Sequence, residues 1–406
     1  MGAALGARWR WVAVAVFAGS CVLNYLDRQV LAMLLVIWHR NAPFRFTDRD
    51  YGLLLSVFSI AYALSAPAMG WFLDRVGLNR GISISVAGWG LASLGSATSH
   101  SFGELMLWRC LLGVAEAGGI SAMGKMGGMY LPAEERAVGL AMSQLGLSLG
   151  AGLAPKFAEV VTREYGWRWV FGGVGALSLL WIPVWLVTAR LIPSPMGDGR
   201  GGGGASSWKL ARDGRLWAMV GANMAGMTVY SLWTNWAPRY LELMHGLKAA
   251  AVADYAGWVP LAGYLGSFFG VSLSWRLIRG GVSAVEARKR VCLGSAAVVL
   301  GTAAIPLAPG PGWATLGMSL SFFWTAAWST NLYTLPVDLY GAERAAFGVS
   351  ALVFAYGAMQ ATVSRPLGGI IERYGFTPVC LVAAVLPLAG QALVASVVRE
   401  RAGDQA

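Results

Sequence analysis

The chain has 406 residues, of which 56% are hydrophobic and only 13% are charged, about half the charged share of a soluble domain. Its formal net charge is +11, which basic cytoplasmic loops of a membrane protein explain better than binding to nucleic acid. This composition argues against a soluble enzyme and against a nucleic-acid-binding protein. It predicts an all-α membrane protein that crosses a lipid bilayer many times.

Apolar runs long enough to cross a bilayer recur along the whole chain. A helix needs about 20 mainly apolar residues to span the hydrocarbon core. Twelve transmembrane helices are predicted on this basis, and the loops between them hold most of the charged residues. The predicted spans are residues 11–37, 50–73, 80–98, 102–130, 136–160, 168–190, 216–241, 251–275, 289–307, 313–338, 345–368 and 376–398.

A segment rich in Gly and Ser divides these spans into two sets. The stretch SPMGDGRGGGGASSWKLARDGR has no apolar period, so a flexible cytoplasmic linker is expected at 191–215. It joins an expected six-helix bundle at 1–190 to a second one at 216–406. GWFLDRVGLNRG and SWRLIRGG occupy equivalent places in the two halves. Two matched halves predict a transporter whose site lies between them, near the midplane of the bilayer.

Four charged residues interrupt the predicted spans: Asp27 and Arg28 in the first, Arg109 and Glu116 in the fourth. At 1.5 Å per residue, Asp27 lies about 24 Å along the helix from Trp11, deep in the apolar slab. A charge at that depth costs several kcal/mol, so it usually marks a functional site. Adjacent helical residues point about 100° apart, so Asp27 and Arg28 are expected to face different surroundings.

The chemistry of these groups suggests distinct roles. An arginine holds a carboxylate through two parallel hydrogen bonds, which makes Arg28 the leading candidate to bind the anion of a substrate. A carboxylic acid that is kept away from water takes up a proton more readily, so Asp27 and Glu116 are candidate proton carriers. Arg109 could pair with either acid and tune it. The alternative is a buried ion network that only fixes helix packing.

Polar and aromatic side chains at mid-span depth suit a hydroxylated ligand, although a buried amide or phenol needs some partner in any case. No His or Cys cluster indicates a metal, and no cofactor other than a coupling proton is expected. The further candidate substrate-binding residues are Tyr62, Arg109, Gln144, Tyr230, Asn235, Trp328, Asn331, Tyr356 and Gln360.

Several phrases together resemble a known family. NYLDRQVLA, GWFLDRVGLNRG, RCLLGVAEAGGISAMGK, YLPAEERAVGLAMS, SWRLIRGGVSAVEARK and NLYTLPVDLYG are similar, in the same order, to the anion:cation symporter family of the major facilitator superfamily. Within that family the bacterial hexuronate and aldonate transporters are most similar. The resemblance implies proton-coupled import of a sugar acid across the bacterial inner membrane.

The resemblance also assigns roles to residues. Asp27 and Glu116 match positions that the family links to protonation, and Arg28 matches one that it links to substrate. Tyr62 and Gln144 fall at positions where the family has sugar-acid ligands. Asn331 lies in NLYTLPVDLYG, which resembles a phrase of the family. The chain departs from the family pattern at Trp275, which stands where an acid is common.

The expected function is therefore symport of an organic anion by alternating access. The expected partners are a small organic anion and the lipid bilayer, with no nucleic acid, and the expected state is a monomer with both termini in the cytoplasm. A facilitator or exchanger of small monocarboxylates is the alternative with the same fold. A membrane sensor or a membrane enzyme is disfavoured, because neither a long soluble segment nor a nucleophile–base set is visible.

Overall fold

The computed structural model describes residues 2–41, 46–131, 135–192 and 207–398. These residues are almost entirely helical, and they separate into two compact units, Met1–Gly202 (unit 1) and Gly203–Ala406 (unit 2). The all-α prediction is thus confirmed. The predicted linker falls mostly outside the described residues, and its last part, Ser207–Arg212, forms a 3₁₀ helix.

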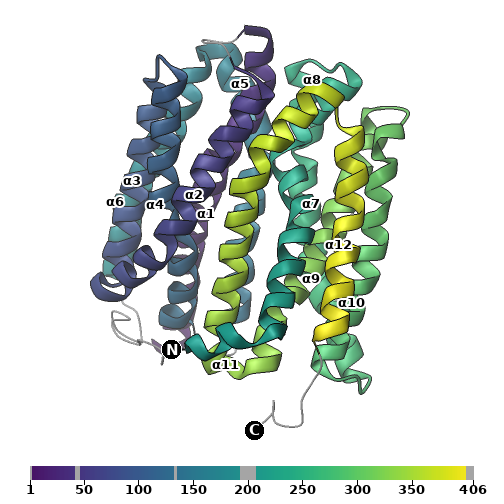
Figure 1. The fold of residues 1–406 in the computed structure, drawn as a ribbon. Helices are drawn as coiled ribbons and strands as arrows, with labels where there is room; N and C mark the ends of the chain where they lie inside the picture. The colour runs from purple at the N-terminus through teal and green to yellow at the C-terminus, as the bar shows by residue number, and fades with distance from the viewer. Residues whose placement is uncertain (1, 42–45, 132–134, 193–206, 399–406) are drawn as a thin grey trace. The chain divides into compact units, whose positions relative to one another are not determined.

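Unit 1 is a bundle of long helices that lie side by side (Figure 1). Helix α1 packs mainly against α5 and α6, α2 against α4, and α3 against α4 and α6. The helices of its described part are α1 (Gly2–Asn41), α2 (Asp48–Val76), α3 (Leu78–Ala97), α4 (Phe102–Tyr130), α5 (Arg136–Tyr165) and α6 (Trp167–Leu191).

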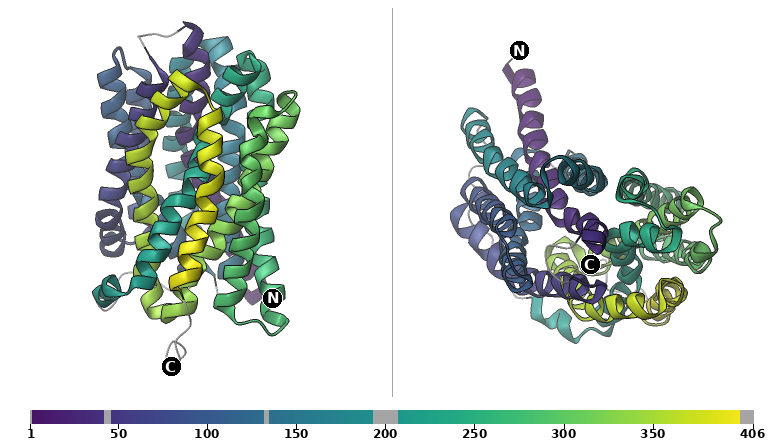
Figure 2. Two further views of the ribbon diagram at one scale, coloured as in Figure 1. Left: turned by 45° about the vertical axis from the view of Figure 1, so that its right-hand side comes forward. Right: turned by 90° about the horizontal axis from the view of Figure 1, so that it is seen from above.

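Unit 2 repeats this packing pattern with its own helices, which the two views of Figure 2 show in teal to yellow. Helix α7 packs against α11 and α12, α9 against α11, and α10 against α11 and α12. The elements of its described part are η1 (Ser207–Arg212), α7 (Gly214–His245), α8 (Ala249–Ala256), α9 (Trp258–Arg279), α10 (Ala284–Val299), η2 (Leu300–Leu307), α11 (Pro311–Tyr374) and α12 (Thr377–Val397).

The predicted spans differ from these helices at three places. The span at 251–275 is divided into α8 and α9 at Gly257. The span at 289–307 ends in the 3₁₀ helix η2, which contains Pro306. The spans at 313–338 and 345–368 both belong to α11. The two parts of α11 fold back on each other, as the approach of Gly348 to Pro336 shows: a Cβ on Gly348 would lie 2.7 Å from the Cβ of Pro336.

Nine segments within the described ranges are long and apolar enough to cross a membrane. The predicted spans at 80–98, 216–241 and 313–338 are not among them, although each lies in a helix. Helix α3 is rich in Ser and Gly, and α7 carries Asn, Arg and Glu, which lowers the mean hydropathy of these helices. The chain is a multi-pass membrane protein.

The repeated phrase at the ends of α2 and α9 has a common structure. The guanidinium of Arg75 lies 5.4 Å from the ring centre of Trp71, and that of Arg279 lies 3.9 Å from the ring centre of Trp275. Helix α2 then stops at Gly77, whose φ of 85° favours glycine. Trp275, which stands where the chain departs from the family pattern, makes this cation–π contact with Arg279.

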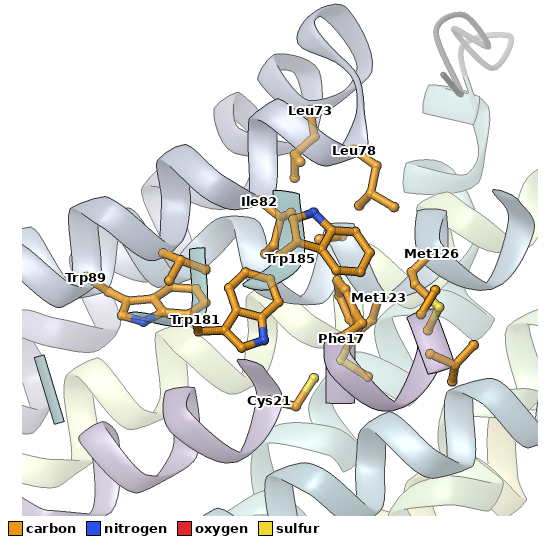
Figure 3. Close-up of a cluster of buried hydrophobic side chains, with 14 of the residues drawn as sticks. Phe17, Cys21, Leu73, Leu78, Ile82, Trp89, Met123, Met126, Trp181 and Trp185 are labelled. Carbon is orange, nitrogen blue, oxygen red and sulfur yellow. The ribbon is translucent and has the colours of Figure 1, made fainter. Parts of the chain in front are cut away.

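The core of unit 1 is a cluster of buried aromatic, aliphatic and methionine side chains (Figure 3). The rings of Trp181 and Trp185 stack at 5.6 Å with an interplanar angle of 9°. Trp181 Nε1 also donates to the Val16 carbonyl at 2.7 Å, which ties α6 to α1. A Cβ on Gly113 would lie 2.5 Å from the Phe58 carbonyl, so this glycine lets α4 approach α2 closely. The fold thereby fixes the middle of α1, α2 and α4 next to one another.

Candidate functional site

The middle of α1 is joined to the middle of α4 by one ion pair inside unit 1. Arg28 Nη2 lies 2.6 Å from Glu116 Oε2, and Arg28 Nε donates to the same oxygen at 3.0 Å. The Arg28 side chain is 18% exposed, whereas that of Glu116 is fully buried. Both hydrogen bonds are charge-assisted, and such bonds are stronger than those between neutral groups.

Three aromatic rings surround the Arg28 guanidinium. It lies 5.0 Å from the ring centre of Tyr25, 4.8 Å from that of Phe58 and 5.2 Å from that of Tyr62. Cation–π contacts of this kind stabilise a guanidinium that has lost part of its water. The rings also restrict its rotation, so that the fork of N–H groups keeps a fixed direction.

Arg28 and Glu116 line a small pocket within unit 1 that is partly open to solvent. Residues one turn apart on α1 form one wall, because positions three and four apart share a helix face. The remainder of the pocket is largely apolar. The lining residues are Phe17, Ser20, Cys21, Asn24, Tyr25, Arg28, Tyr62, Ile82, Trp89, Glu116, Gly119, Met123 and Leu147; several of these appear in Figure 3.

Asp27 faces a different part of unit 1 and does not line this pocket. It is fully buried, and Ser93 Oγ of α3 lies 3.0 Å from both Asp27 Oδ1 and the Phe171 carbonyl oxygen of α6. The adjacent residues Asp27 and Arg28 therefore have separate surroundings.

Arg109 lies on the same side as Asp27. Its guanidinium is 4.8 Å from the ring centre of Phe171, and it interacts electrostatically with Asp27, Glu116 and Tyr51. Within the described ranges neither its Nε nor its Nη2 makes a hydrogen bond, and it forms no direct ion pair with either acid. The expected pairing of Arg109 is thus indirect here, because Glu116 pairs with Arg28.

Two further candidates in unit 1 differ in position. Tyr62 is part of the pocket and stacks on Phe58, with ring centres 5.9 Å apart and an interplanar angle of 27°. Gln144 is exposed on α5 and is not among the pocket residues. The structure therefore brings Tyr62, but not Gln144, together with Arg28 and Glu116.

Two candidates of unit 2, Tyr230 and Tyr356, belong to one aromatic group. A third, Asn235, is a polar residue of α7. The ring of Tyr230 lies 4.7 Å from that of Phe322 and 6.1 Å from that of Tyr356, which it meets edge to face. Asn235 is buried and donates to the Ser231 carbonyl one turn earlier at 3.0 Å. A buried amide that bonds its own helix is less available to a ligand than an exposed one.

Trp328, Asn331 and Gln360 lie in the interior of unit 2. Trp328 is fully buried in a core cluster between α7, α10 and α11. Asn331 Nδ2 donates to the Ala327 carbonyl at 2.9 Å, and its Oδ1 accepts from Arg288 Nη1 at 3.3 Å. Gln360 is 8% exposed. In this structure these residues contribute to packing and to polar contacts within the unit.

Sequence reasoning missed the polar network around Arg288 of α10. Its Nη1 lies 2.5 Å from Ser274 Oγ, and its Nε lies 3.3 Å from Asp338 Oδ2. With Asn331 this network joins α9, α10 and α11. The available signal was Asp338 in the phrase NLYTLPVDLYG, an acid at the end of an apolar run.

The chain is similar to known membrane transporters. The model of the Major Facilitator Superfamily matches residues 17–364. The hexuronate transporter of Escherichia coli K12 is 24% identical over 97% of this chain and 94% of its own length. The D-galactonate transporter of Escherichia coli O6:H1 is 25% identical over 96% and 95%. The expected likeness to bacterial sugar acid transporters is confirmed.

A solved structure shows the same fold. The bacterial homologue of the human lysosomal transporter Spinster, in an inward-facing and unoccupied conformation, matches with a TM-score of 0.70. It is 20% identical, and the match covers 96% of this chain and 94% of that one. At this level of identity the match extends to the fold alone.

Proposed function

Because this chain belongs to the Major Facilitator Superfamily and is a transporter of organic anions rather than an enzyme, we propose that it imports a sugar acid together with protons by alternating access. The sugar acid is a hexuronate or an aldonate. The observation that carries the proposal is the Arg28–Glu116 ion pair, which lines a pocket in the middle of the apolar helices.

Arg28 is the anion-binding group. Its guanidinium is partly exposed and held in a fixed direction by three aromatic rings. A guanidinium binds the two oxygens of a carboxylate in parallel, which a lysine does not do. In the present state its Nε and Nη2 are occupied by Glu116, so an incoming carboxylate competes with Glu116 for Arg28.

This competition couples the proton to the anion. When Glu116 takes up a proton, it loses its charge and its strong hold on Arg28, which then binds the substrate. Conversely, a substrate bound to Arg28 removes the cation that keeps Glu116 ionised. Each ligand therefore favours the binding of the other, as thermodynamic linkage requires.

Asp27 is a second proton-carrying group with a different position. It is completely buried between α1, α3 and α6 and interacts electrostatically with Arg109. A change in the charge of Asp27 changes its electrostatic interactions with Arg109 and Glu116, although Asp27 itself does not contact the substrate. In this proposal Asp27 responds to protons, and Arg28 binds the anion.

The topology in the proposal has twelve spans in two six-helix halves, 1–190 and 216–406, with the linker 191–215 and both termini in the cytoplasm. The protein acts as a monomer in the inner membrane of a bacterium. Tyr62 contacts the sugar acid near its carboxylate. Gln144, Tyr230, Asn235, Trp328, Asn331, Tyr356 and Gln360 remain candidate contacts for its hydroxyl groups.

A facilitator or exchanger of small monocarboxylates is the second candidate. The apolar wall that Phe17, Ile82 and Met123 give to the pocket favours it, because such a wall suits a small anion with few hydroxyl groups. Competition of transport by glucuronate and by lactate separates the two candidates. Effective inhibition by lactate alone would favour the second one.

Uptake into proteoliposomes tests the proposal. With an inward proton gradient, the wild type is expected to accumulate a sugar acid, whereas Glu116→Gln is expected to exchange it without accumulation. Glu242→Gln is a suitable control, because Glu242 is a buried acid that pairs with Arg239 at 2.8 Å in unit 2. Full accumulation by Glu116→Gln would contradict the coupling role of Glu116.

A further inference from the structure

The hydroxyl of Ser93 in α3 is shared between a carboxyl group and a backbone carbonyl. Its Oγ lies 3.0 Å from Asp27 Oδ1 of α1 and 3.0 Å from the Phe171 carbonyl oxygen of α6. Ser93 is 1% exposed, and Asp27 is fully buried. A serine hydroxyl carries one hydrogen and two lone pairs, so Ser93 can donate to only one of these two oxygens at a time.

Close packing of α3 against α6 places the Phe171 carbonyl beside Ser93. A Cβ on Gly175 would lie 2.7 Å from the Gly90 carbonyl oxygen, and a Cβ on Gly90 would lie 3.1 Å from the Gly175 carbonyl oxygen. Gly90 is three residues before Ser93 and Gly175 is four residues after Phe171, so each glycine shares a helix face with its neighbour. The two backbones therefore meet next to Ser93, and the hydroxyl can turn between its two acceptors while the helices stay in place.

The two oxygens of Asp27 differ in their surroundings. Within the described ranges, Asp27 Oδ2 makes no hydrogen bond, whereas Oδ1 lies beside Ser93. A buried O–H without an acceptor is unfavourable, so a proton on Asp27 is better placed on Oδ1 than on Oδ2. In that state Oδ1 donates to Ser93 Oγ, and the Ser93 hydrogen turns to the Phe171 carbonyl. Both hydrogens then have an acceptor.

We propose that Ser93 is a positioning residue for proton binding by Asp27: its hydroxyl donates to the ionised acid, and it accepts from the protonated acid while it donates to the Phe171 carbonyl. This inference rests on the proposed function, in which Asp27 carries a proton. The proton that Asp27 gains is the only atom added, because the Ser93 hydrogen turns without leaving its oxygen. One hydroxyl thereby gives the buried acid a hydrogen bond in both charge states.

The charged groups near Asp27 act on it from a distance. Within the described ranges none of them makes a hydrogen bond or a direct ion pair with Asp27, whereas Ser93 contacts it. Their charges contribute to the pH at which Asp27 titrates, so removal of the Ser93 hydroxyl should add a local effect to an otherwise unchanged field. The groups that interact electrostatically with Asp27, or with the cation of α4 beside it, are Arg28 of α1, Tyr51 of α2, and Arg109 and Glu116 of α4.

Infrared spectroscopy of the purified full-length protein, titrated with acid, measures the charge state of Asp27 without a transport assay. The protonated-carboxyl band that disappears in Asp27→Asn belongs to Asp27. In Ser93→Ala the midpoint of this band's titration should move up by about one pH unit, because the ionised acid loses a stronger hydrogen bond than the neutral acid does. The band should also move to the frequency of a carboxyl without a hydrogen bond.

Ser96→Ala is the matched control from the same helix. Ser96 is as buried as Ser93 and lies one turn further along α3, but its Oγ donates to the Ala92 carbonyl at 3.0 Å. The loss of this hydroxyl removes a buried hydrogen bond that does not involve Asp27. Both the midpoint and the frequency of the Asp27 band should therefore stay as in the wild type.

An unchanged midpoint and frequency in Ser93→Ala, or an equal shift in Ser96→Ala, would overturn the role of Ser93 and leave the proposed function intact. If Ser93→Ala does not fold, the wild-type band decides, because a frequency typical of a carboxyl without a hydrogen bond would overturn the role as well. A wild type with no Asp27-dependent band at any pH at which the protein is folded would refute the proton role of Asp27 in the proposed function, and the role of Ser93 with it.

Discussion

Removal of the charge of Glu116 should make the anion site stronger at high pH. In the wild type a substrate carboxylate must displace Glu116 from Arg28, and this ion pair has two hydrogen bonds in a largely buried place. A hydrogen bond to a charged group contributes about 1.5–3 kcal/mol. Glu116→Gln keeps the shape of the side chain but competes far less for the guanidinium.

The magnitude follows from this pair. A loss of competition worth about 1.5–3 kcal/mol corresponds to about 10- to 100-fold tighter binding. The effect has a definite sign with pH, because protons neutralise Glu116 in the wild type and so release Arg28. Wild-type affinity should therefore increase as the pH falls and approach that of Glu116→Gln, whose affinity should depend little on pH.

The assay is calorimetric titration of D-galactonate into purified protein at pH 8 and at pH 6. Glu242→Gln is the control, because it removes another buried and paired acid outside the pocket, and it should behave like the wild type. A wild-type affinity that does not change with pH would refute the competition. Weaker binding by Glu116→Gln at both pH values would refute it as well.

Three further variants give separate expectations. Arg28→Lys should weaken anion binding by about tenfold or more, because lysine lacks the planar fork; calorimetry measures this, and unchanged affinity would contradict the role of the guanidinium. Asp27→Asn should leave anion affinity within about threefold, because Asp27 does not line the pocket, but should lower pH-driven accumulation in proteoliposomes; full accumulation would argue against its proton role. Gly266→Ala should destabilise the protein by about 1–3 kcal/mol, because the added Cβ would overlap the Phe323 backbone. Gly294→Ala should not destabilise it, because the space around that Cβ is open. Thermal unfolding in detergent compares the two variants, and equal unfolding midpoints would contradict the packing.

The charged positions in the helices of unit 1 could be predicted from the sequence because a charge in an apolar run is rare for a physical reason. The helical angle between adjacent residues also anticipated separate surroundings for Asp27 and Arg28. The ion pair between Arg28 and Glu116 could not be predicted, because it depends on how closely α4 approaches α1 and α2. Glycines such as Gly113 control that approach, and their contacts appear only in the folded chain.

Unit 2 illustrates the opposite case. Arg288 lies in the first turns of α10, where a basic residue is ordinary in sequence, yet it connects Ser274 and Asp338 across three helices. Asn331 was singled out as a ligand for its depth, and the structure gives it a partner in Arg288. Depth in a span indicates that a polar group needs a partner, but it does not distinguish a neighbouring side chain from a substrate.

Proton uptake during substrate binding tests the central claim most directly. D-galactonate added to purified protein in weakly buffered solution, at a pH where Glu116 is ionised, should cause proton uptake that follows occupancy of the site, because the anion takes Arg28 away from Glu116. The uptake should be clearly smaller in Glu116→Gln and unchanged in Glu242→Gln. Binding without proton uptake by the wild type, or equal uptake in Glu116→Gln, would contradict the claim that the substrate and Glu116 share one guanidinium.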